Sequence, residues 1–387
     1  MRSALPVALL VALPALVACT QNATVDNSTA GGDGTIAVTA GDTACEVSAA
    51  SAPAGTLTFE VTNAGSKVNE FYLYSADGKR VIGEVENIGP GLQGKLIVTA
   101  EQGDYLTACK PGMSGTGIRA GFTVSAPASG SAAPSADQVL ISAAQNRYRL
   151  WVQRQADTLV DRTRQFVTAY AAGDGERARS LYPRARTYWE SIETVAESFG
   201  QLDPRTDARE ADLRPGQKWT GWHRIEKDLW PQRDPSYTPL TAGQRRAYGD
   251  DLLHNVTTVR DLIGDLTFTT DQIANGSSGL MEEVATSKVT GEEEYWSHTD
   301  LWDFAANVEG ARIGYQDVRP ILRTRDPSLA RTLDARFASI DRLLKQQRVG
   351  DGYRLYTDLG RAEVKRLADA VNALSEPLSH LTAAVLP

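Results

Sequence analysis

Histidine is scarce in this chain, and its scarcity excludes two kinds of metal site. The 387 residues include four histidines, none of which lies between residues 34 and 125. A blue-copper centre binds its metal through two histidines and a cysteine, so that stretch cannot build one. A zinc-protease helix carries two histidines, as H-E-x-x-H or H-x-x-E-H. Here His223-Arg224-Ile225-Glu226 is followed by Lys227, and the next histidine is His254, so this pattern is absent too.

Long apolar runs are also rare. The stretch from Ala4 to Val17 is almost wholly apolar, and no other run could span a bilayer. It predicts a lipoprotein signal peptide over residues 1–18, because it ends in Leu16-Val17-Ala18-Cys19, which is typical of a bacterial lipobox. We expect cleavage before Cys19 and a lipid on that cysteine, although an ordinary signal peptide is the alternative. Residues 19–33 then form a flexible tether outside the cytoplasm.

Cysteine is the third scarce residue, with three in the chain, and the net charge of −8 argues against a nucleic-acid partner. If Cys19 carries the lipid, Cys45 and Cys109 remain. In an oxidising compartment such a pair is first of all a candidate disulfide. The two could instead be thiolate ligands of a metal, and the residues alone leave both alternatives open.

The composition changes partway along the chain, which indicates a multi-domain protein. Residues 34–125 are rich in Gly, Thr, Val and Ile, and their short alternating segments predict about seven strands in a β-sandwich. Residues 126–136, which are mostly Ala, Ser and Pro, predict a linker. In residues 137–387 the apolar positions recur at steps of three and four, which predicts about seven or eight helices in an all-α bundle.

Two pairs of residues with i, i+3 spacing point to a metal site in the helical region. Glu190 and Glu193 form one pair and His223 and Glu226 the other, so each pair lies on one helix face. If the pairs converge, several carboxylates and one imidazole form a ligand set for iron, zinc, copper or manganese, and the excess of carboxylates favours iron. The basic residues nearest to Glu190 and Glu193, of which Arg186 is the last, come before this pair in the chain. The alternatives are a solvated acidic face and a core histidine.

A second acidic group lies further along the helical region. It could supply a distal metal ligand or a surface for docking a partner, or it could be a solvated turn before a helix that begins near Leu301. Its members are Glu292, Glu293, Glu294, His298, Asp300 and Asp303. The sequence does not decide among these roles.

Longer strings carry a resemblance to known families. The segment from Tyr188 to Glu226, with its E-x-x-E and H-x-x-E motifs, resembles the imelysin-like domain, and so does the stretch from Glu282 to Gly310. The run Cys109-Lys110-Pro111-Gly112-Met113 after a strand makes the N-terminal region similar to a cupredoxin. With the lipobox, the chain as a whole resembles the EfeO-type iron-uptake lipoproteins. This resemblance implies an N-terminal cupredoxin-like β-sandwich followed by an imelysin-like all-α bundle.

The resemblance also implies two metal sites. In the helical domain, the implied iron ligands are Glu190, Glu193, Asp207, His223 and Glu226, of which Asp207 rests most on the resemblance. In the N-terminal domain, the implied ligands of copper or iron are Cys45, Glu70, Cys109 and Met113. A Cys45–Cys109 disulfide is the alternative to this second site. Zinc is a further ion that we expect the protein to take up in vitro.

The function implied by the resemblance is iron uptake. The protein would capture iron outside the cytoplasm and pass it to an iron permease, with a haem peroxidase of the same system as a second partner and a lipid anchor in the membrane. It would then be a carrier and not an enzyme. Two alternatives stay open. One is a metal-dependent enzyme, either a ferroxidase or a metallopeptidase, and the other is an interaction module of the cell envelope.

Overall fold

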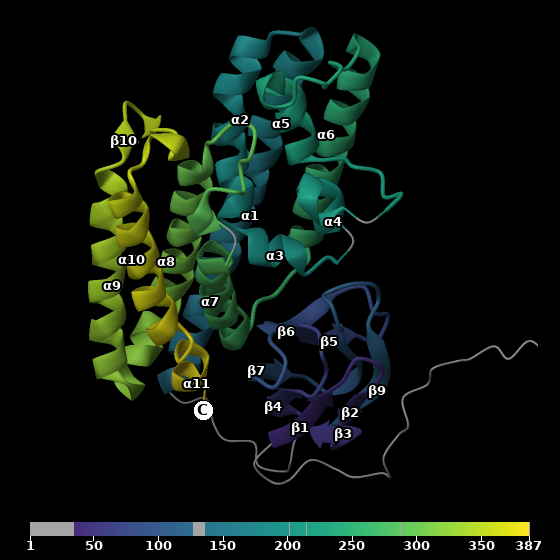
Figure 1. Ribbon diagram of the computed structural model, residues 1–387. Coiled ribbons are helices and arrows are strands. Elements are labelled where there is room, and N and C mark those ends of the chain that lie inside the picture. Colours follow the sequence, from purple (N-terminus) through teal and green to yellow (C-terminus); the bar gives the residue numbers. More distant parts are fainter. Residues whose placement is uncertain (1–34, 127–135, 201, 214, 287, 387) are drawn as a thin grey trace, which may run out of the picture.

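The computed structural model describes residues 35–126, 136–200, 202–213, 215–286 and 288–386 (Figure 1). The predicted signal peptide, Cys19, the tether and nearly all of the linker lie outside these ranges. Along the described chain a β-sandwich comes first and a set of long helices follows. The predicted fold class is therefore confirmed.

The strand-rich region is built from two sheets, with the orders β2-β1-β4-β7 and β3-β9-β8-β5-β6. Within residues 35–126 there are two more strands than the alternation predicts. The additional strands, β2 and β3, have three residues each, too few for a period of two to show. The strands are β1 (Thr35–Ala40), β2 (Cys45–Val47), β3 (Ser51–Pro53), β4 (Gly55–Asn63), β5 (Asn69–Ser75), β6 (Val81–Ile88), β7 (Gln93–Ala100), β8 (Gly103–Cys109) and β9 (Ile118–Ser125).

Alternate residues of these strands fill the space between the two sheets. The ring of Phe59 lies 5.1 Å from that of Phe71 and 5.6 Å from that of Phe122, measured between centroids. A disulfide joins Cys45 on β2 to Cys109 at the end of β8, with 5.6 Å between the Cα atoms. Of the two alternatives for these cysteines, the structure has the disulfide, which links one sheet to the other.

Replacing both cysteines, Cys45→Ser and Cys109→Ser, is expected to lower the stability of the β-sandwich by about 2–5 kcal/mol. The bridge closes a large loop of the unfolded chain and clamps two sheets in the folded one. Differential scanning calorimetry of the oxidised protein and the double variant would measure the change. Iron binding by the helical region should be unaffected, because the bridge lies entirely within the sandwich. A loss of iron binding that accompanies the loss of sandwich stability would contradict this expectation.

The helical region contains seven helices of 16 residues or more among the residues described, in line with the predicted number. Several begin at clear capping residues: Thr241 and Gln244 form a capping box at the start of α6. The helices are α1 (Ala136–Ala172), α2 (Gly175–Glu190), α3 (Glu193–Glu197), α4 (Leu202–Thr206), α5 (Trp222–Leu229), α6 (Ala242–Gly264), α7 (Thr270–Thr286), α8 (Asp300–Arg325), α9 (Pro327–Lys345), α10 (Arg361–Leu378) and α11 (Leu381–Val385).

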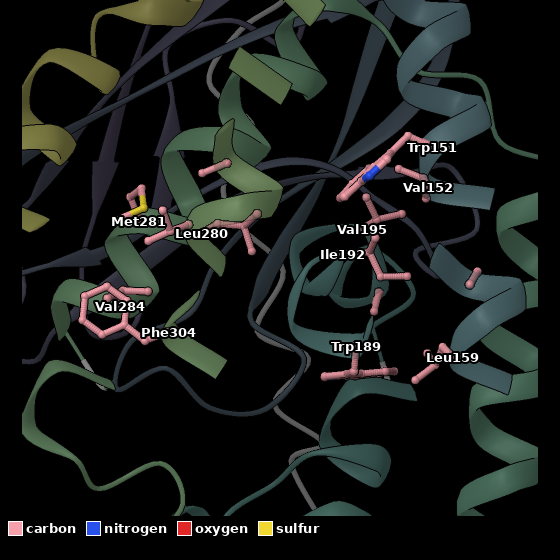
Figure 2. Close-up of a cluster of buried hydrophobic side chains, with 14 of the residues drawn as sticks. Trp151, Val152, Leu159, Trp189, Ile192, Val195, Leu280, Met281, Val284 and Phe304 are labelled. Carbon is pink, nitrogen blue, oxygen red and sulfur yellow. The ribbon is translucent and has the colours of Figure 1, made fainter. Parts of the chain in front are cut away.

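Short elements complete this region. They are the 3-10 turns η1 (Glu210–Asp212), η2 (Pro231–Arg233), η3 (Lys288–Thr290) and η4 (Tyr356–Asp358) and the two-stranded ribbon β10 (Arg348–Val349) and β11 (Gly352–Tyr353). The apolar faces of the long helices form one continuous core. Figure 2 shows part of it, where Trp189 and Ile192 lie among side chains of neighbouring helices. This packing fixes the end of α2, next to which the polar residues of the candidate site gather.

The sandwich lies against α3 and α7 (Figure 1). The backbone N–H of Thr99 on β7 donates to Asp271 Oδ2 at 2.9 Å, and the Asn275 side chain donates to the Ile97 carbonyl at 2.9 Å. From β6, the Val81 N–H donates to the carbonyl that follows α3. These bonds use backbone groups at the edge of the sheets, so they hold the two domains together at a defined position.

Candidate metal centre

The stretch around Glu190 is broken, although its spacing predicts one helix face. α2 ends at Glu190 and α3 begins at Glu193. The break is stabilised from α8, where the side-chain amide of Asn307 donates to the Glu190 carbonyl at 2.9 Å and to Glu193 Oε2 at 3.0 Å. Gly310 allows this approach, because a Cβ there would lie 2.3 Å from the Ser191 carbonyl oxygen. Both carboxylates are therefore buried against α8, and the interpretation of this stretch as a solvated acidic face is wrong.

His223 and Glu226 do share one face, on the short helix α5. This helix begins after Gly221, whose φ of 86° favours glycine. The chain at Thr206 passes so close that a Cβ on Gly221 would lie 2.0 Å from the Thr206 carbonyl oxygen. The close approach brings the next residue, Asp207, to the imidazole, with 3.3 Å between Asp207 Oδ1 and His223 Nε2.

Both ring nitrogens of His223 face carboxylates. Nδ1 lies 3.1 Å from Glu226 Oε2, whereas Nε2 lies 3.3 Å from Asp207 Oδ1 and 3.5 Å from Glu293 Oε1. Nε2 is buried, and within the described part of the chain it makes no well-aligned hydrogen bond. A cation at this nitrogen would meet two carboxylate oxygens at once, which is the arrangement of a metal ligand set.

Glu226 holds the imidazole and the acidic segment in place together. Its Oε1 accepts hydrogen bonds from the backbone N–H groups of Trp296 at 2.9 Å and Ser297 at 2.6 Å. Its Oε2 faces the ring Nδ1. Because this one carboxylate binds both the imidazole and the backbone of the acidic segment, it holds Glu293 and Glu294 against α5. Glu226 thus has the position of a residue that orients a metal-binding histidine.

The acidic segment belongs to the same site. Glu292 is exposed and His298 is partly exposed, but the other acidic members, Glu293, Glu294, Asp300 and Asp303, are buried. The interpretation of this segment as a solvated turn is therefore wrong for these four. The interpretation as a source of further ligands agrees with where the structure places Glu293 and Glu294.

Two buried cations lie inside the cluster. Arg186, one turn before Glu190, contacts that residue at 2.6 Å, and it also reaches Asp207, Glu293, Glu294 and Asp303. Lys288 lies between Glu190 Oε2 at 2.6 Å and Glu193 Oε2 at 2.7 Å. The acidic stretch at Glu190 therefore does have a basic neighbour one turn away.

The negative charge exceeds the positive charge. In this cluster, the fully buried cations Arg186 and Lys288 lie among eight of the buried carboxylates that the structure describes, which are Glu190, Glu193, Asp207, Glu226, Glu293, Glu294, Asp300 and Asp303. Burial raises the pKa of the Glu294 carboxyl, and the charge of Glu226 raises it further. Burying unbalanced charge is costly, so such a cluster holds protons or takes up a cation.

The five predicted ligands come together in overlapping groups. Ligand atoms within 4.8 Å of one another are found in Asp207–His223–Glu293, in His223–Glu226–Glu294 and in Glu190–Glu193–Asp207. Asp207 links the two predicted pairs. Glu293 and Glu294 join them from a segment whose role the sequence left open. Together these side chains could hold a cation through one imidazole and several oxygens.

Comparison with known proteins places this arrangement in a family. Residues 144–381 match the imelysin family and residues 7–124 match the cupredoxin-like domain. The chain is 35% identical over 349 residues to the iron uptake system component EfeO of Escherichia coli O157:H7, which covers 89% of this chain and 90% of the relative. The chain belongs to the EfeO family. Identity and coverage are the same for EfeO of Escherichia coli strain K12 and of Shigella flexneri.

The EfeO family membership confirms the resemblance on which the predicted sites depend. The residues described include no helix that is long and apolar enough to cross a membrane. Metal binding by the clustered side chains remains a prediction. Arg186 and Lys288 were missed as members of the cluster. Arg186 could have been found from its i, i+4 spacing to Glu190, whereas Lys288 carries no such signal.

The second metal site that the EfeO resemblance implies, in the N-terminal domain, does not offer two free thiolates. The sulfurs of Cys45 and Cys109 are bonded to each other, so neither is free to bind a metal. Met113 is half exposed. The Glu70 carboxylate is buried and accepts a hydrogen bond from the Tyr72 hydroxyl at 2.9 Å. The set Cys45, Glu70, Cys109 and Met113 therefore lacks the free thiolates that would favour copper.

Metal binding at His223 is expected to release at least one proton per ion near neutral pH. Burial and the Arg186 charge lower the pKa of His223, but the hydrogen bond with Glu226, the close contact with Glu293 and the charge of Asp207 outweigh them and raise it to about 10. At neutral pH the metal-free imidazole therefore carries two protons, and an ion at Nε2 must displace one. Affinity should rise with pH up to about 10, by roughly tenfold per unit for each proton displaced.

Calorimetric titration with Fe(II) in two buffers of different ionisation enthalpy, at one pH, would count these protons. The apparent enthalpy should differ between buffers by the number of protons released times the difference in ionisation enthalpy. An enthalpy that is the same in both buffers would contradict the proton displacement.

Proposed function

We propose that this protein captures iron outside the cytoplasm and passes it to a membrane permease. Asp207, His223 and Glu293 would be the central ligands, with Glu190, Glu193 and Glu226 around them. The observation that carries the proposal is the buried Nε2 of His223, which faces two carboxylates without a well-aligned hydrogen bond. The names of the relatives, which are iron uptake system components, support iron as the ion.

The donor set also supports iron. Carboxylate oxygens suit hard cations, and an imidazole suits transition metals, so a mixture rich in oxygen fits iron better than copper. Zinc would bind in vitro through the same atoms. The imbalance of charge adds a driving force, because a bound cation neutralises carboxylates that are otherwise buried next to one another.

The two buried cations suit a carrier rather than a permanent metal site. Lys288 Nζ binds one oxygen each of Glu190 and Glu193, and Arg186 binds Asp207 and Glu293. An arriving ion must compete with these side chains for the same oxygens. When the ion leaves, they can return and neutralise the carboxylates again. Such exchange lowers the cost of release, which a protein that delivers iron requires.

The setting of the protein follows from the family and from the predicted lipobox. A lipid on Cys19 would anchor the chain to the membrane on its extracytoplasmic side. An iron permease of the same uptake system would receive the ion, and a haem peroxidase of that system would be the second partner. In this arrangement the chain carries iron and does not catalyse a reaction.

Iron titration of the protein and of His223→Ala tests the proposal. We use the name bundle centre for the group of Glu190, Glu193, Asp207, His223, Glu226, Glu293 and Glu294. We expect it to bind about one Fe(II) in the parent, as measured by calorimetry and by mass spectrometry of the loaded protein. In the variant the affinity should fall by about 100-fold or more. His254→Ala is the matched control, because His254 is exposed on α6. Iron retained in His223→Ala would move the site elsewhere. No binding by the parent would refute iron carriage.

A further inference from the structure

A cavity of about 590 Å³ lies between the two domains, where β6 and β7 face α3 and α7. Each side contributes acidic side chains to its wall. β6 supplies two of them, α3 supplies two and α7 supplies two. These residues are Glu84, Glu86, Glu193, Glu197, Glu282 and Glu283. We refer to this space as the interdomain cavity.

The positive charge in the wall does not balance these acids. Arg80, Lys95 and His380 also line the cavity. The ammonium of Lys95, however, lies 3.2 Å from Glu60, outside the wall. Partial burial raises the pKa of Glu86, and the charge of Glu283 across the domain boundary raises it further. A cavity with this balance of charge attracts cations and concentrates them.

The number of protons beside Glu86, a residue of the cavity wall, also points to a cation. The hydroxyl oxygen of Tyr72 lies 2.9 Å from Glu70 Oε2 and 2.9 Å from Glu86 Oε1. A phenol has one proton and can donate to one of these oxygens. The other contact then needs a proton on a carboxyl group. A cation beside these two carboxylates could take the place of that proton.

The inner end of the cavity is part of the metal centre. Glu193 lines the cavity and also belongs to the group Glu190–Glu193–Asp207. It is 6% exposed, and its Oε2 is bound by Lys288 and Asn307. Behind it the centre is closed: Glu190, Glu226 and Glu294 are fully buried.

We propose that the interdomain cavity is the route by which iron reaches the bundle centre, with carboxylates of both domains holding the cation on its way to Glu193. This inference rests on the proposed function and adds the path to it. The cavity opens beside the cupredoxin-like domain and ends at a ligand of the centre. Its wall needs both domains, so the route gives the β-sandwich a role that does not require a copper site of its own.

The test compares rates with affinities. Glu84→Gln and Glu282→Gln together remove one charge from each side of the cavity without touching a residue of the centre. Anaerobic Fe(II) binding is followed by stopped-flow tryptophan fluorescence, since Trp189 and Trp222 lie next to Glu190 and His223 in the chain. At low ionic strength the association rate should fall by roughly tenfold. Dissociation should slow by a similar factor, because the ion leaves by the same path, so the equilibrium affinity should hardly change.

The control pair is Glu46→Gln with Glu309→Gln, which removes the same net charge from exposed positions, one in each domain. Its rates should match those of the parent, and thermal unfolding would verify that all the proteins are folded. Equal rates in the cavity pair and the control pair would overturn the route. A weaker affinity with an unchanged association rate would do so too, because the carboxylates would then be ligands. Failure of the parent to bind iron would instead refute the proposed function.

Discussion

The Arg186→Met substitution is expected to lower the free energy of unfolding by about 3–5 kcal/mol, because it removes a buried cation from a group of carboxylates. Arg186 is fully buried, and its guanidinium contacts five of them. Methionine has a long, flexible, uncharged side chain and retains much of the packing, so the loss reports mainly on charge. In a helical domain of this size the midpoint of thermal unfolding should fall by roughly 10 °C.

Arg184→Met is the matched control, two residues earlier on the same helix. Its guanidinium is more than a third exposed and pairs with Asp351 at 2.7 Å near the solvent. An exposed pair contributes about 1 kcal/mol or less, so this variant should unfold almost as the parent does. Similar small losses in both variants would mean that the buried carboxylates are neutral in the folded protein and do not need Arg186.

The pH dependence separates charge from packing. Burial raises the pKa of Asp303 and of Glu294, and the Arg186 charge opposes this effect on both. Without Arg186 these two carboxyl groups should hold protons in the folded protein at a pH where the unfolded chain has lost them, so the folded variant binds more protons than the unfolded one. Its stability should therefore rise as the pH falls from about 8 to about 6, and the difference from the parent should shrink. A cavity left by a missing side chain would give a loss that is independent of pH. Urea unfolding at several pH values would measure the difference.

The sequence predicts the architecture well because the evidence for it is local. Alternation over 34–125 and steps of three and four over 137–387 report the buried faces of strands and helices directly. The same reasoning fails at Glu190 and Glu193, where helical spacing continues but the helix does not. The break depends on Asn307 and Gly310, which come from a helix more than a hundred residues away. No local pattern reports a contact at that separation.

The ligand set shows the same limit. The pair His223 and Glu226 is visible from its spacing, and the structure confirms that the two face each other. Asp207 depends on the family resemblance, since it reaches the imidazole through a close approach of two loops at Gly221. The buried state of Glu293 could not be predicted, because an acidic run before a helix is usually solvated. Here the backbone bonds from Trp296 and Ser297 to Glu226 bury it.

The Glu226→Gln substitution is expected to weaken iron binding by about 10- to 100-fold while leaving the protein folded. The new amide must keep its oxygen toward the N–H groups of Trp296 and Ser297, which bind Glu226 Oε1 in the parent. Its NH₂ group then faces His223 Nδ1, where Glu226 Oε2 now lies at 3.1 Å. A donor at this position requires Nδ1 to accept, so the neutral ring carries its proton on Nε2. In the parent, a metal ion can replace the Nε2 proton while Glu226 keeps the proton on Nδ1, whereas the variant disfavours a proton on Nδ1.

Imidazole ¹⁵N chemical shifts would follow the tautomer directly, and Fe(II) calorimetry would follow the affinity. Glu376→Gln is the control, because Glu376 forms a surface pair with His380 at 3.5 Å and should change neither measurement at the bundle centre. Unchanged affinity in Glu226→Gln would mean that iron does not bind through Nε2. Loss of the Nδ1 proton, together with a normal unfolding midpoint and weak binding, would establish that Glu226 acts by orienting the histidine. Since the same carboxylate also holds the acidic segment, Glu226→Ala should lose stability as well, which separates its two roles.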